Sequence, residues 1–375
     1  MTDSKKTPSA LLAMLPLVLL VVMLVVTVRA YGSDSLLGAS QVTLLAVSAC
    51  CVLIGTLFLH IPFKDFERAI THNISSVTSA ILILLFIGSL SGTWMVSGVV
   101  PSLIYYGVQI IHPEIFLFSS CLISAMVSIM TGSSWTTIAT IGIALMGIGR
   151  AQGFEEGWIA GAIISGAYFG DKISPLSDTT VLASGTLNVS IFKHIRYMLI
   201  TTVPSLAISL IIFLIAGFCT VSTSSHEINQ FTTALSSRFT ITPWLLIVPL
   251  LTGVMIAKRL PPVVTLCLST LLAVVFALIF QPQVLAEIVD GNLFKGAMQS
   301  IYGETSVQTT NPMLTSLVAT RGMQGMMNTI WLIICAMCFG GAMEAGGMVR
   351  SLTRLFVRMI RGRVSMVAST VCSAH

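Results

Sequence analysis

The chain has 375 residues, of which 55% are hydrophobic and only 9% are charged, and its mean hydropathy is +0.95. A soluble globular domain carries about 25% charged residues, so this composition excludes a soluble enzyme or binding domain and indicates a polytopic membrane protein. The net charge of +5 does not indicate a nucleic-acid partner. The basic residues lie in short loops beside apolar segments, as is usual in membrane proteins, whose cytoplasmic loops are enriched in lysine and arginine.

Apolar runs of about the 20 residues that a membrane-spanning helix needs recur from residue 10 onward. The first run lacks a clear small-residue cleavage site, so we expect a retained helix rather than a signal peptide. A charged loop is expected at 64–68. The runs that predict spans are 10–28, 36–59, one that follows Arg196 and ends near 220, 243–257, 261–280 and 326–348. We therefore predict an all-α, polytopic integral membrane protein whose single transmembrane domain covers 1–375.

Two further apolar runs are interrupted by glycine and hydroxyl residues. The run 74–111 contains IGSLSGTWMVSG, and the run that begins at 113 contains TGSSWTT at 131–137. Such interruptions predict broken helices, which a membrane tolerates where the backbone lines a cavity or is buried in protein. Thr93, Ser133 and Ser134 are therefore secondary candidates for ion ligands. The alternative is that both motifs form glycine-hydroxyl packing faces.

Residues 166–180 concentrate the polar chemistry of the chain in the sequence GAYFGDKISPLSDTT. An ionisable group at membrane depth costs a few kcal/mol or more and therefore indicates a functional site. Pro175 lacks an amide hydrogen, so the helix should unwind between Asp171 and Asp178. The alternative is a tight loop at the membrane surface in which Asp178 only caps the next helix.

The unwound stretch offers only oxygen ligands, which hard cations prefer. A carboxylate that is buried in protein can hold a proton near neutral pH, whereas a sodium ion favours its ionised form. Proton and Na+ would then compete for one alternately exposed site, which is sufficient for exchange. The proposed ligands are Asp178, Asp171, Ser174, Ser177, Thr179 and Thr180, with Na+ at the two aspartates.

Three more polar residues are secondary candidates. Lys172 either pairs with an aspartate in the ion-free state or anchors the helix at a headgroup. Glu344 lies among glycines in a predicted span, and its role in ion binding or in a hydrogen bond between helices is left open. Asn311 belongs to the polar region 281–321, whose place inside or outside the membrane is also left open.

The arginines at 350–363 predict an interfacial basic amphipathic helix. Arg350, Arg354, Arg358 and Arg361 fall on one face and apolar residues on the other. With the N-terminus in the cytoplasm, thirteen Lys and Arg residues lie in inside loops and four in outside loops. This imbalance predicts a cytoplasmic N-terminus and an even number of crossings between Arg68 and Lys193.

Together with TGSSWTT, IGSLSGTW and RGMQGMMNTIWLIICAMCFGGAMEAGGMV from Arg321, the stretch 166–180 resembles the NhaC family of sodium/proton antiporters along nearly the whole chain. The resemblance implies an exchanger of the bacterial inner membrane, built from inverted repeats, that moves Na+ or Li+ out against H+ coming in. It implies no resident cofactor. The expected partners are Na+, Li+, H+ and the lipid bilayer, with a homodimer as an open alternative.

The family also implies further spans beyond residue 375, including a second Ser-Pro-Leu break that would partner the one at 174–176. The apolar segment 364–374 holds about half the residues that a span needs. We therefore expect a transporter that is incomplete at its C-terminus.

Two other functions are weighed against sodium/proton exchange. Some relatives resemble sodium-coupled malate or lactate exchangers, which would need an anion pocket; the sequence offers only Lys172, Asn311 and helix N-termini for it. The remote alternative is an intramembrane aspartyl protease, suggested by FGD at 169–171. That chemistry needs two aspartates on facing elements, whereas Asp171 and Asp178 share one short segment. We therefore expect a transporter and not an enzyme.

Overall fold

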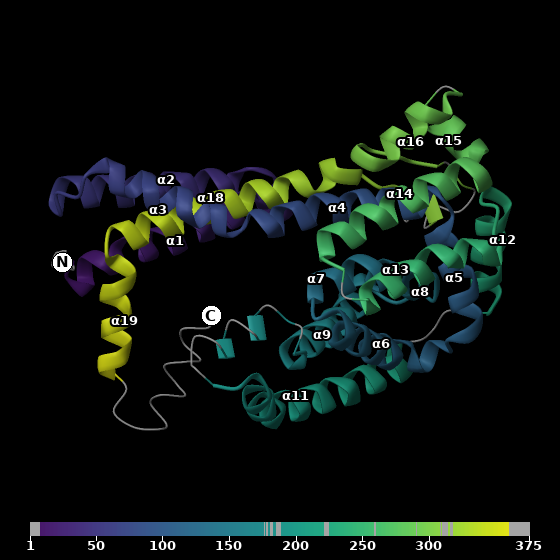
Figure 1. Cartoon of the computed structure of the whole chain (residues 1–375), viewed down its shortest axis with the longest axis horizontal. Coiled ribbons are helices and arrows are strands. Elements are labelled where there is room, and N and C mark those ends of the chain that lie inside the picture. Colours follow the sequence, from purple (N-terminus) through teal and green to yellow (C-terminus); the bar gives the residue numbers. More distant parts are fainter. Residues whose placement is uncertain are drawn as a thin grey trace. The chain divides into compact units, whose positions relative to one another are not determined.

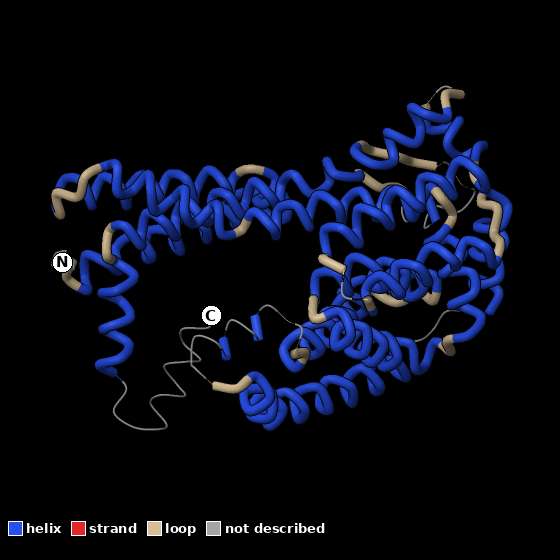
Figure 2. Tube along the Cα trace, viewed as in Figure 1, coloured by secondary structure: helices blue, strands red, loops and turns tan. Residues whose placement is uncertain are grey.

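The computed structural model describes residues 8–175, 177, 179–180, 183–184, 189–220, 225–258, 260–289, 291–307, 309, 314–315 and 318–359. These residues form helices and connecting loops (Figure 2), with one isolated antiparallel bridge between Thr305 and Thr320. Seven of the described helices are long and apolar enough to cross a membrane. The prediction of an all-α, polytopic membrane protein is confirmed.

The chain divides into two compact units, which are labelled by their helices in Figure 1. Unit 1 comprises Met1–Ile81 with Met327–His375, and unit 2 comprises Leu82–Met326. The helices of unit 1 are α1 (Ala10–Tyr31), α2 (Ala39–Phe58), α3 (Phe63–Ser76), α18 (Met327–Ala345) and α19 (Met348–Met359), with a 3-10 turn at Gly32–Leu37.

In unit 1, α18 packs against both α2 and α3. Small residues permit this close approach. A Cβ added at Gly341 of α18 would lie 2.7 Å from the Cα of Ile70, and one added at Gly55 of α2 would collide with the ring of Phe66. Buried residues of α1, α2, α3, α18 and α19 form one hydrophobic cluster, so apolar contacts hold these five helices together.

The prediction of a charged loop at 64–68 is wrong, because these residues begin α3. Pro62 precedes the helix, and Asp65 lies in its first turn. A negative charge at this end of a helix stabilises the helix through its interaction with the helix dipole. Phe66 is buried, whereas Lys64 and Glu67 are exposed. The charges therefore occupy the polar side of an amphipathic helix rather than a loop.

Unit 2 contains most of α4 (Thr78–Val96) and the helices that follow it. These are α5 (Val99–Ile110), α6 (Phe116–Thr131), α7 (Ser134–Thr137), α8 (Ile143–Ala151), α9 (Glu156–Ile173), α11 (Ile191–Thr220), α12 (Ser225–Arg238), α13 (Ile247–Ala257), α14 (Pro262–Phe280), α15 (Pro282–Ile288) and α16 (Leu293–Tyr302). A π-helical turn, Ile138–Gly142, joins α7 to α8, and 3-10 turns lie at Pro113–Ile115, Pro243–Leu246 and Gly322–Met326.

The closest helix pair of unit 2 is α6 with α9. A Cβ added at Gly166 would lie 2.0 Å from the carbonyl oxygen of Cys121, and one added at Gly170 would lie 2.5 Å from the Cβ of Ser128. The hydroxyl of Ser128 donates to the carbonyl of Ala167. Small residues of α9 therefore pack closely against α6, and this contact holds the end of α9.

The broken helix predicted from the motif at 87–98 is confirmed, and the break lies at the end of the motif. IGSLSGTWMV is helical throughout α4, and the chain turns only at Gly98, whose φ is +81°. The hydroxyls in α4 donate to carbonyls of the same helix, Ser89 to Leu85 at 3.1 Å and Thr93 to Ser89 at 2.8 Å. Glycine and hydroxyl residues therefore do not interrupt this helix.

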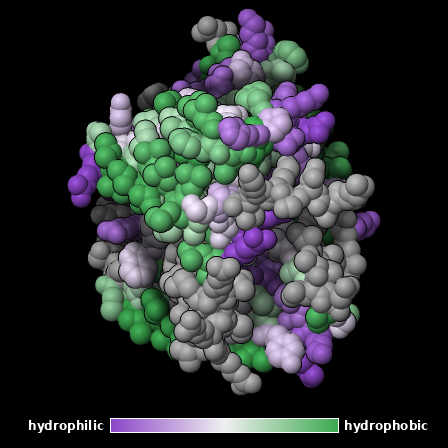
Figure 3. Space-filling model, turned by 90° about the vertical axis from the view of Figure 1, so that its left-hand side faces the viewer, coloured by the Kyte–Doolittle hydropathy of each residue, from purple (hydrophilic) through white to green (hydrophobic). Residues whose placement is uncertain are grey.

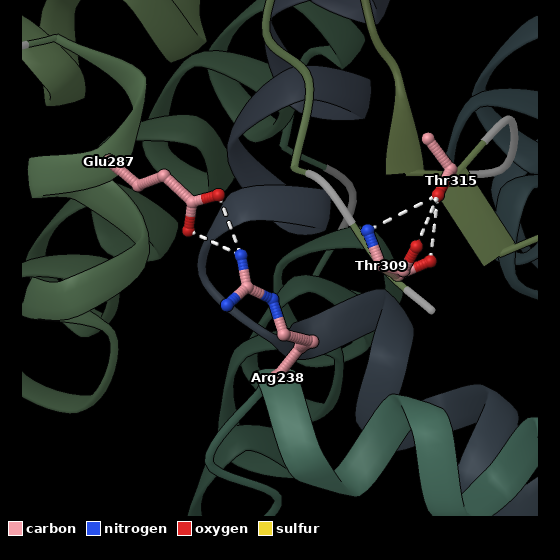
Figure 4. Close-up of polar contacts among 4 residues, drawn as sticks. All are labelled: Arg238, Glu287, Thr309 and Thr315. Carbon is pink, nitrogen blue, oxygen red and sulfur yellow. Dashed lines mark hydrogen bonds and ion pairs between the residues drawn. The ribbon is translucent and has the colours of Figure 1, made fainter. Parts of the chain in front are cut away.

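The polar segment between α11 and α13 contains α12. The helical segment Gln230–Arg238 meets Pro243–Ala257 at an angle of 89°. At the end of α12, the guanidinium of Arg238 donates to both carboxylate oxygens of Glu287 at 2.6 Å (Figure 4). This ion pair ties α12 to α15.

Exposed apolar side chains are abundant, as a membrane protein requires. Figure 3 shows them, in green, over a large part of one face. On α11, Phe192 is 74% exposed and Ile200 is 65% exposed. In α19, which covers part of the predicted amphipathic helix, Arg350 and Arg354 are exposed and Leu352 and Leu355 are partly buried. Residues 360–363 lie outside the described part of the chain.

Candidate functional site

The TGSSWTT motif forms a true helix break. Helix α6 ends at Thr131, and Gly132 takes a left-handed conformation with φ +66°. Ser133 then caps α7, its hydroxyl accepting from the backbone N–H of Thr136 at 3.2 Å. A left-handed residue favours glycine and a helix N-cap favours serine, so the order Gly-Ser explains why the chain breaks here.

A second break follows α9, as Pro175 predicts. The helix ends at Ile173, and Ser174 is extended, with φ −76° and ψ +130°. A residue that precedes proline is biased toward this conformation. The Ser174 hydroxyl donates to the carbonyl of Ile129 on α6 at 2.8 Å. The second break is therefore fastened to the helix that leads into the first.

A cavity of about 310 Å³ lies between the two breaks. Its lining combines the TGSSWTT motif, the stretch after α9, and apolar residues at the start of α14 and the end of α13. The lining residues used below are Thr131, Ser133, Trp135, Thr136, Asp171, Ser177, Thr179, Pro261, Pro262 and Thr265. Among the described lining residues, Asp171 is the one that carries a charge.

Asp171 is held by the first break. The Ser134 hydroxyl, which is buried, donates to Asp171 Oδ2 at 2.9 Å across 37 residues of sequence. A hydrogen bond to an ionised carboxylate is worth about 1.5–3 kcal/mol, roughly twice a neutral one. This bond orients the carboxylate toward the first break.

The hydroxyls around Asp171 are connected to each other. Thr131 Oγ1 lies 3.1 Å from the Ser133 carbonyl and 3.2 Å from Thr137 Oγ1. Ser177 Oγ and Thr179 Oγ1 are 2.8 Å apart. A hydroxyl has one donor and two acceptor lone pairs, so a hydroxyl that donates to its neighbour still offers oxygen to a cation. The described lining is therefore suited to a hard cation.

The structure brings together part of the predicted site. Asp171, Ser133, Ser177 and Thr179 line the cavity, and Ser134 binds Asp171. Two other predicted ligands support the backbone instead. Ser174 bonds to α6, and Thr180 Oγ1 lies 3.2 Å from the carbonyl of Lys172 at the end of α9.

The structure does not place the remaining candidates at this cavity. Asp178 and Asn311 fall outside the described residues. Thr93 is buried in α4, where its hydroxyl bonds to Ser89. Glu344 is exposed on α18 of unit 1.

Lys172 does not line the Asp171 cavity. It lines a separate cavity of about 300 Å³ between α9 and α11, with Ser165, Thr202 and Ser209. Its ammonium lies 5.2 Å from the centre of the Tyr168 ring, within the range of a cation–π interaction. In this arrangement Lys172 belongs to a different surface of α9 from that of its neighbour Asp171.

Several lining residues were not predicted. Thr131 and Thr136 belong to the TGSSWTT motif, so the predicted helix break at this motif could have identified them as lining residues. The π-helical turn after α7 is a feature often found at functional sites, but it has no sequence signature here. Pro261, Pro262 and Thr265 begin a regular apolar helix, and only the tertiary fold brings them to the cavity.

Comparisons with known proteins identify the family of this chain. Residues 166–375 match the model of the Na+/H+ antiporter family. A malate-2H(+)/Na(+)-lactate antiporter of Bacillus subtilis (strain 168) is 36% identical over 314 residues, which cover 83% of this chain and 65% of that protein. No solved structure gives a significant match.

Two relatives are named Na(+)/H(+) antiporter NhaC. The one from Alkalihalophilus pseudofirmus is 37% identical over 328 residues, 86% of this chain and 69% of the relative. The one from Bacillus subtilis is 33% identical over 332 residues, 88% of this chain and 72% of the relative. The chain thus spans 65% to 72% of the length of these three proteins.

Proposed function

The chain belongs to the Na+/H+ antiporter family. We propose that the Asp171 cavity binds Na+ or Li+ in exchange for H+. The observation that carries the proposal is the Ser134–Asp171 hydrogen bond, which joins two helix breaks around an oxygen-lined cavity. Regular packing of apolar helices needs no such arrangement. Broken helices around a midplane ion site are typical of secondary transporters.

In the proposed mechanism, Asp171 binds either a proton or a sodium ion. When Asp171 is protonated, its charge is neutral and the hydroxyls of the cavity bond to one another. When Na+ enters, it favours the ionised carboxylate, and hydroxyl oxygens replace part of its hydration shell. The proton leaves as the ion arrives, so exposure of the cavity to each side in turn exchanges one for the other.

Asp178 is proposed as the second carboxylate. Its sequence neighbours Ser177 and Thr179 both line the cavity, which supports a place for Asp178 in the same ion site. Two carboxylates in one site would let one bind the ion while the other carries a proton.

Exchange coupled to a small carboxylate is the second candidate. The observation that favours it is the 36% identity with the malate-2H(+)/Na(+)-lactate antiporter. In that case Asp171 would still bind Na+, and the organic anion would need a separate positively charged site.

The proposed location is the bacterial inner membrane, with the N-terminus in the cytoplasm. The distribution of lysine and arginine among the loops supports this orientation. Exposed arginines on α19 would then lie at the cytoplasmic surface, near anionic lipid headgroups.

The test uses inside-out vesicles from a bacterial host that lacks its own antiporters, with the protein expressed in its natural reading frame. A pH-sensitive dye reports whether added Na+, Li+ or K+ collapses a preformed proton gradient. Collapse by Na+ or Li+ alone, lost in Asp171→Asn, supports the proposal. Collapse only when malate or lactate accompanies Na+ would support the second candidate, and a response to K+ equal to that to Na+ would contradict both.

A further inference from the structure

A second, larger cavity lies in unit 2, and its lining residues differ from those of the Asp171 cavity. Its volume is about 590 Å³, within the range of small-molecule sites. Most of its lining is apolar, but it contains two arginines, Arg150 and Arg321. The residues used below are Ser91, Met95, Ile143, Met146, Arg150, Ile163, Thr320, Arg321 and Met326.

Arg321 lies at the depth of a membrane-spanning helix. A Cβ added at Gly88, near the middle of α4, would meet the carbonyl oxygen of Gly322, and one added at Gly92 would lie 3.5 Å from Thr320 Oγ1. Helix α4 is long and apolar enough to span a membrane. The segment on either side of Arg321 therefore packs against the central part of a span, where a charged residue indicates function.

Backbone bonds hold this segment in an irregular conformation. Thr305 and Thr320 exchange N–H···O bonds of 2.8 and 2.9 Å, and their hydroxyls lie 2.7 Å apart. Between these residues, Thr309 and Thr315 are also joined, with hydroxyls 2.8 Å apart (Figure 4). Non-helical backbone at membrane depth is tolerated where it lines a cavity, and here it carries Thr320 and Arg321 into the cavity lining.

The charge of Arg321 is balanced by an exposed ion pair. Arg321 Nε lies 4.0 Å from Glu304 Oε1, and both side chains are about 70% exposed. Exposed ion pairs of this kind are worth about 0–1 kcal/mol. An anion that enters the cavity can therefore compete with Glu304 for Arg321. Arg150, which is partly buried, lies 3.3 Å from Glu156.

We infer that this cavity binds an organic monocarboxylate with an apolar body. A guanidinium binds a carboxylate through two parallel N–H···O bonds. Ser91 and Thr320, which line the same cavity, offer hydroxyls as further hydrogen-bond donors. Met95, Met146 and Met326 provide a flexible apolar surface for the rest of the ligand. Malate is expected to bind more weakly, because it lacks an apolar body that could contact the methionines. This site stands independently of sodium/proton exchange at Asp171.

The test measures equilibrium binding of radiolabelled octanoate to the purified protein in phosphatidylcholine nanodiscs, by scintillation proximity. Saturable binding is expected, with displacement by unlabelled octanoate and much weaker displacement by malate. Arg321→Gln should weaken binding about tenfold or more, the loss expected for a charge-assisted hydrogen bond, and Arg150→Gln by a smaller factor. Lys295→Gln removes the same charge from an exposed residue of α16 and should change affinity by less than about twofold.

Three further measurements make the result decisive. Arg321→Lys keeps the positive charge but lacks the planar guanidinium, so it should give an intermediate affinity. This variant also tests the proposal if Arg321→Gln fails to fold. Displacement by 1-octanol as strong as that by octanoate would overturn the proposal, because the tail alone would then account for binding. Loss of octanoate binding in nanodiscs that contain phosphatidylglycerol would also overturn it, in favour of a lipid headgroup.

Absence of saturable binding, or unchanged binding in both arginine variants, would overturn it as well. The measurement needs no ion gradient. A failure here therefore leaves sodium/proton exchange to be judged by the vesicle assay with Na+ or Li+ alone, and the two failures can be told apart.

Discussion

Hydroxyl side chains behave differently in helix α2 of unit 1 and in the broken stretches of unit 2. In α2, the hydroxyl of Ser48 donates to the carbonyl of Leu44 at 2.7 Å, within the same helix. In the broken stretches, Ser134 donates to Asp171 and Ser174 donates to a carbonyl on α6, so these bonds join segments far apart in sequence. A hydroxyl in an apolar helix therefore indicates little by itself. A hydroxyl at a helix break, bonded to another break, indicates a site.

The largest effect is expected from removing the carboxylate at the breaks. Asp171→Asn should reduce apparent Na+ affinity more than any other variant described below, because it removes the one charge among the described residues that line the cavity. The measurement is Na+-dependent dequenching of the pH dye in inside-out vesicles.

The matched control for that variant is Glu67→Gln, on the exposed face of α3 in the regular region. It makes the same acid-to-amide change and should leave the apparent Na+ affinity within about twofold. Equal losses in the two variants would remove the distinction between broken and regular segments.

The next prediction compares a hydroxyl at a helix break with a hydroxyl that bonds within a regular helix. Ser134→Ala should weaken apparent Na+ affinity by a factor of about ten or more, because Asp171 loses a charge-assisted hydrogen bond worth about 1.5–3 kcal/mol. Ser48→Ala makes the same change in α2 and should alter the affinity by less than about twofold. If Ser134→Ala transported with the wild-type Na+ affinity, the Asp171 contact would be structural only.

A third variant tests whether close packing of α6 and α9 positions the site. Gly166→Ala forces a methyl group against the carbonyl of Cys121. Overpacking of this kind costs about 1–3 kcal/mol, so we expect lower thermal stability of the purified protein together with weaker Na+ affinity.

Gly253→Ala on α13 is the control for this packing effect, because a Cβ there meets nothing within 4 Å. Alanine favours a helix over glycine by about 0.5–1 kcal/mol, so Gly253→Ala should leave stability unchanged or raised. A stable Gly166→Ala protein would show that the two helices can separate without cost.

The smallest effect is expected at Lys172. Its ammonium lies over the Tyr168 ring, in a cavity that Asp171 does not line. Lys172→Ala should therefore change apparent Na+ affinity by less than about twofold, as is usual for a residue that makes one exposed cation–π contact. A tenfold gain in affinity would instead show that Lys172 competes with the ion.

The sequence predicted where polar chemistry gathers but not how it is assembled. Pro175 and the Gly132-Ser133 pair predicted two breaks, because proline lacks an amide hydrogen and because glycine and serine favour the ends of helices. The contact between Ser134 and Asp171 depends on how α6 packs against α9, and no local pattern encodes it.

One sequence prediction was confirmed only at the end of its motif, and another failed. Glycines and hydroxyls at 87–98 predicted a broken helix, and the break lies at Gly98, because the hydroxyls before it bond within α4 and Gly88 and Gly92 serve close packing. The charged stretch at 64–68 predicted a loop, yet it forms the polar face of α3. The composition of a segment does not show whether its polar groups are used inside a helix or between helices.

The most direct test of the central claim is equilibrium binding of 22Na+ to the purified protein as a function of pH. If Na+ and a proton compete for Asp171, the apparent Kd for Na+ should rise by up to about tenfold for each unit of decreasing pH, the limit for one proton displaced by one ion. Asp171→Asn should then show no comparable pH dependence and little binding. Na+ binding that is independent of pH, or that persists with wild-type affinity in Asp171→Asn, would contradict the account.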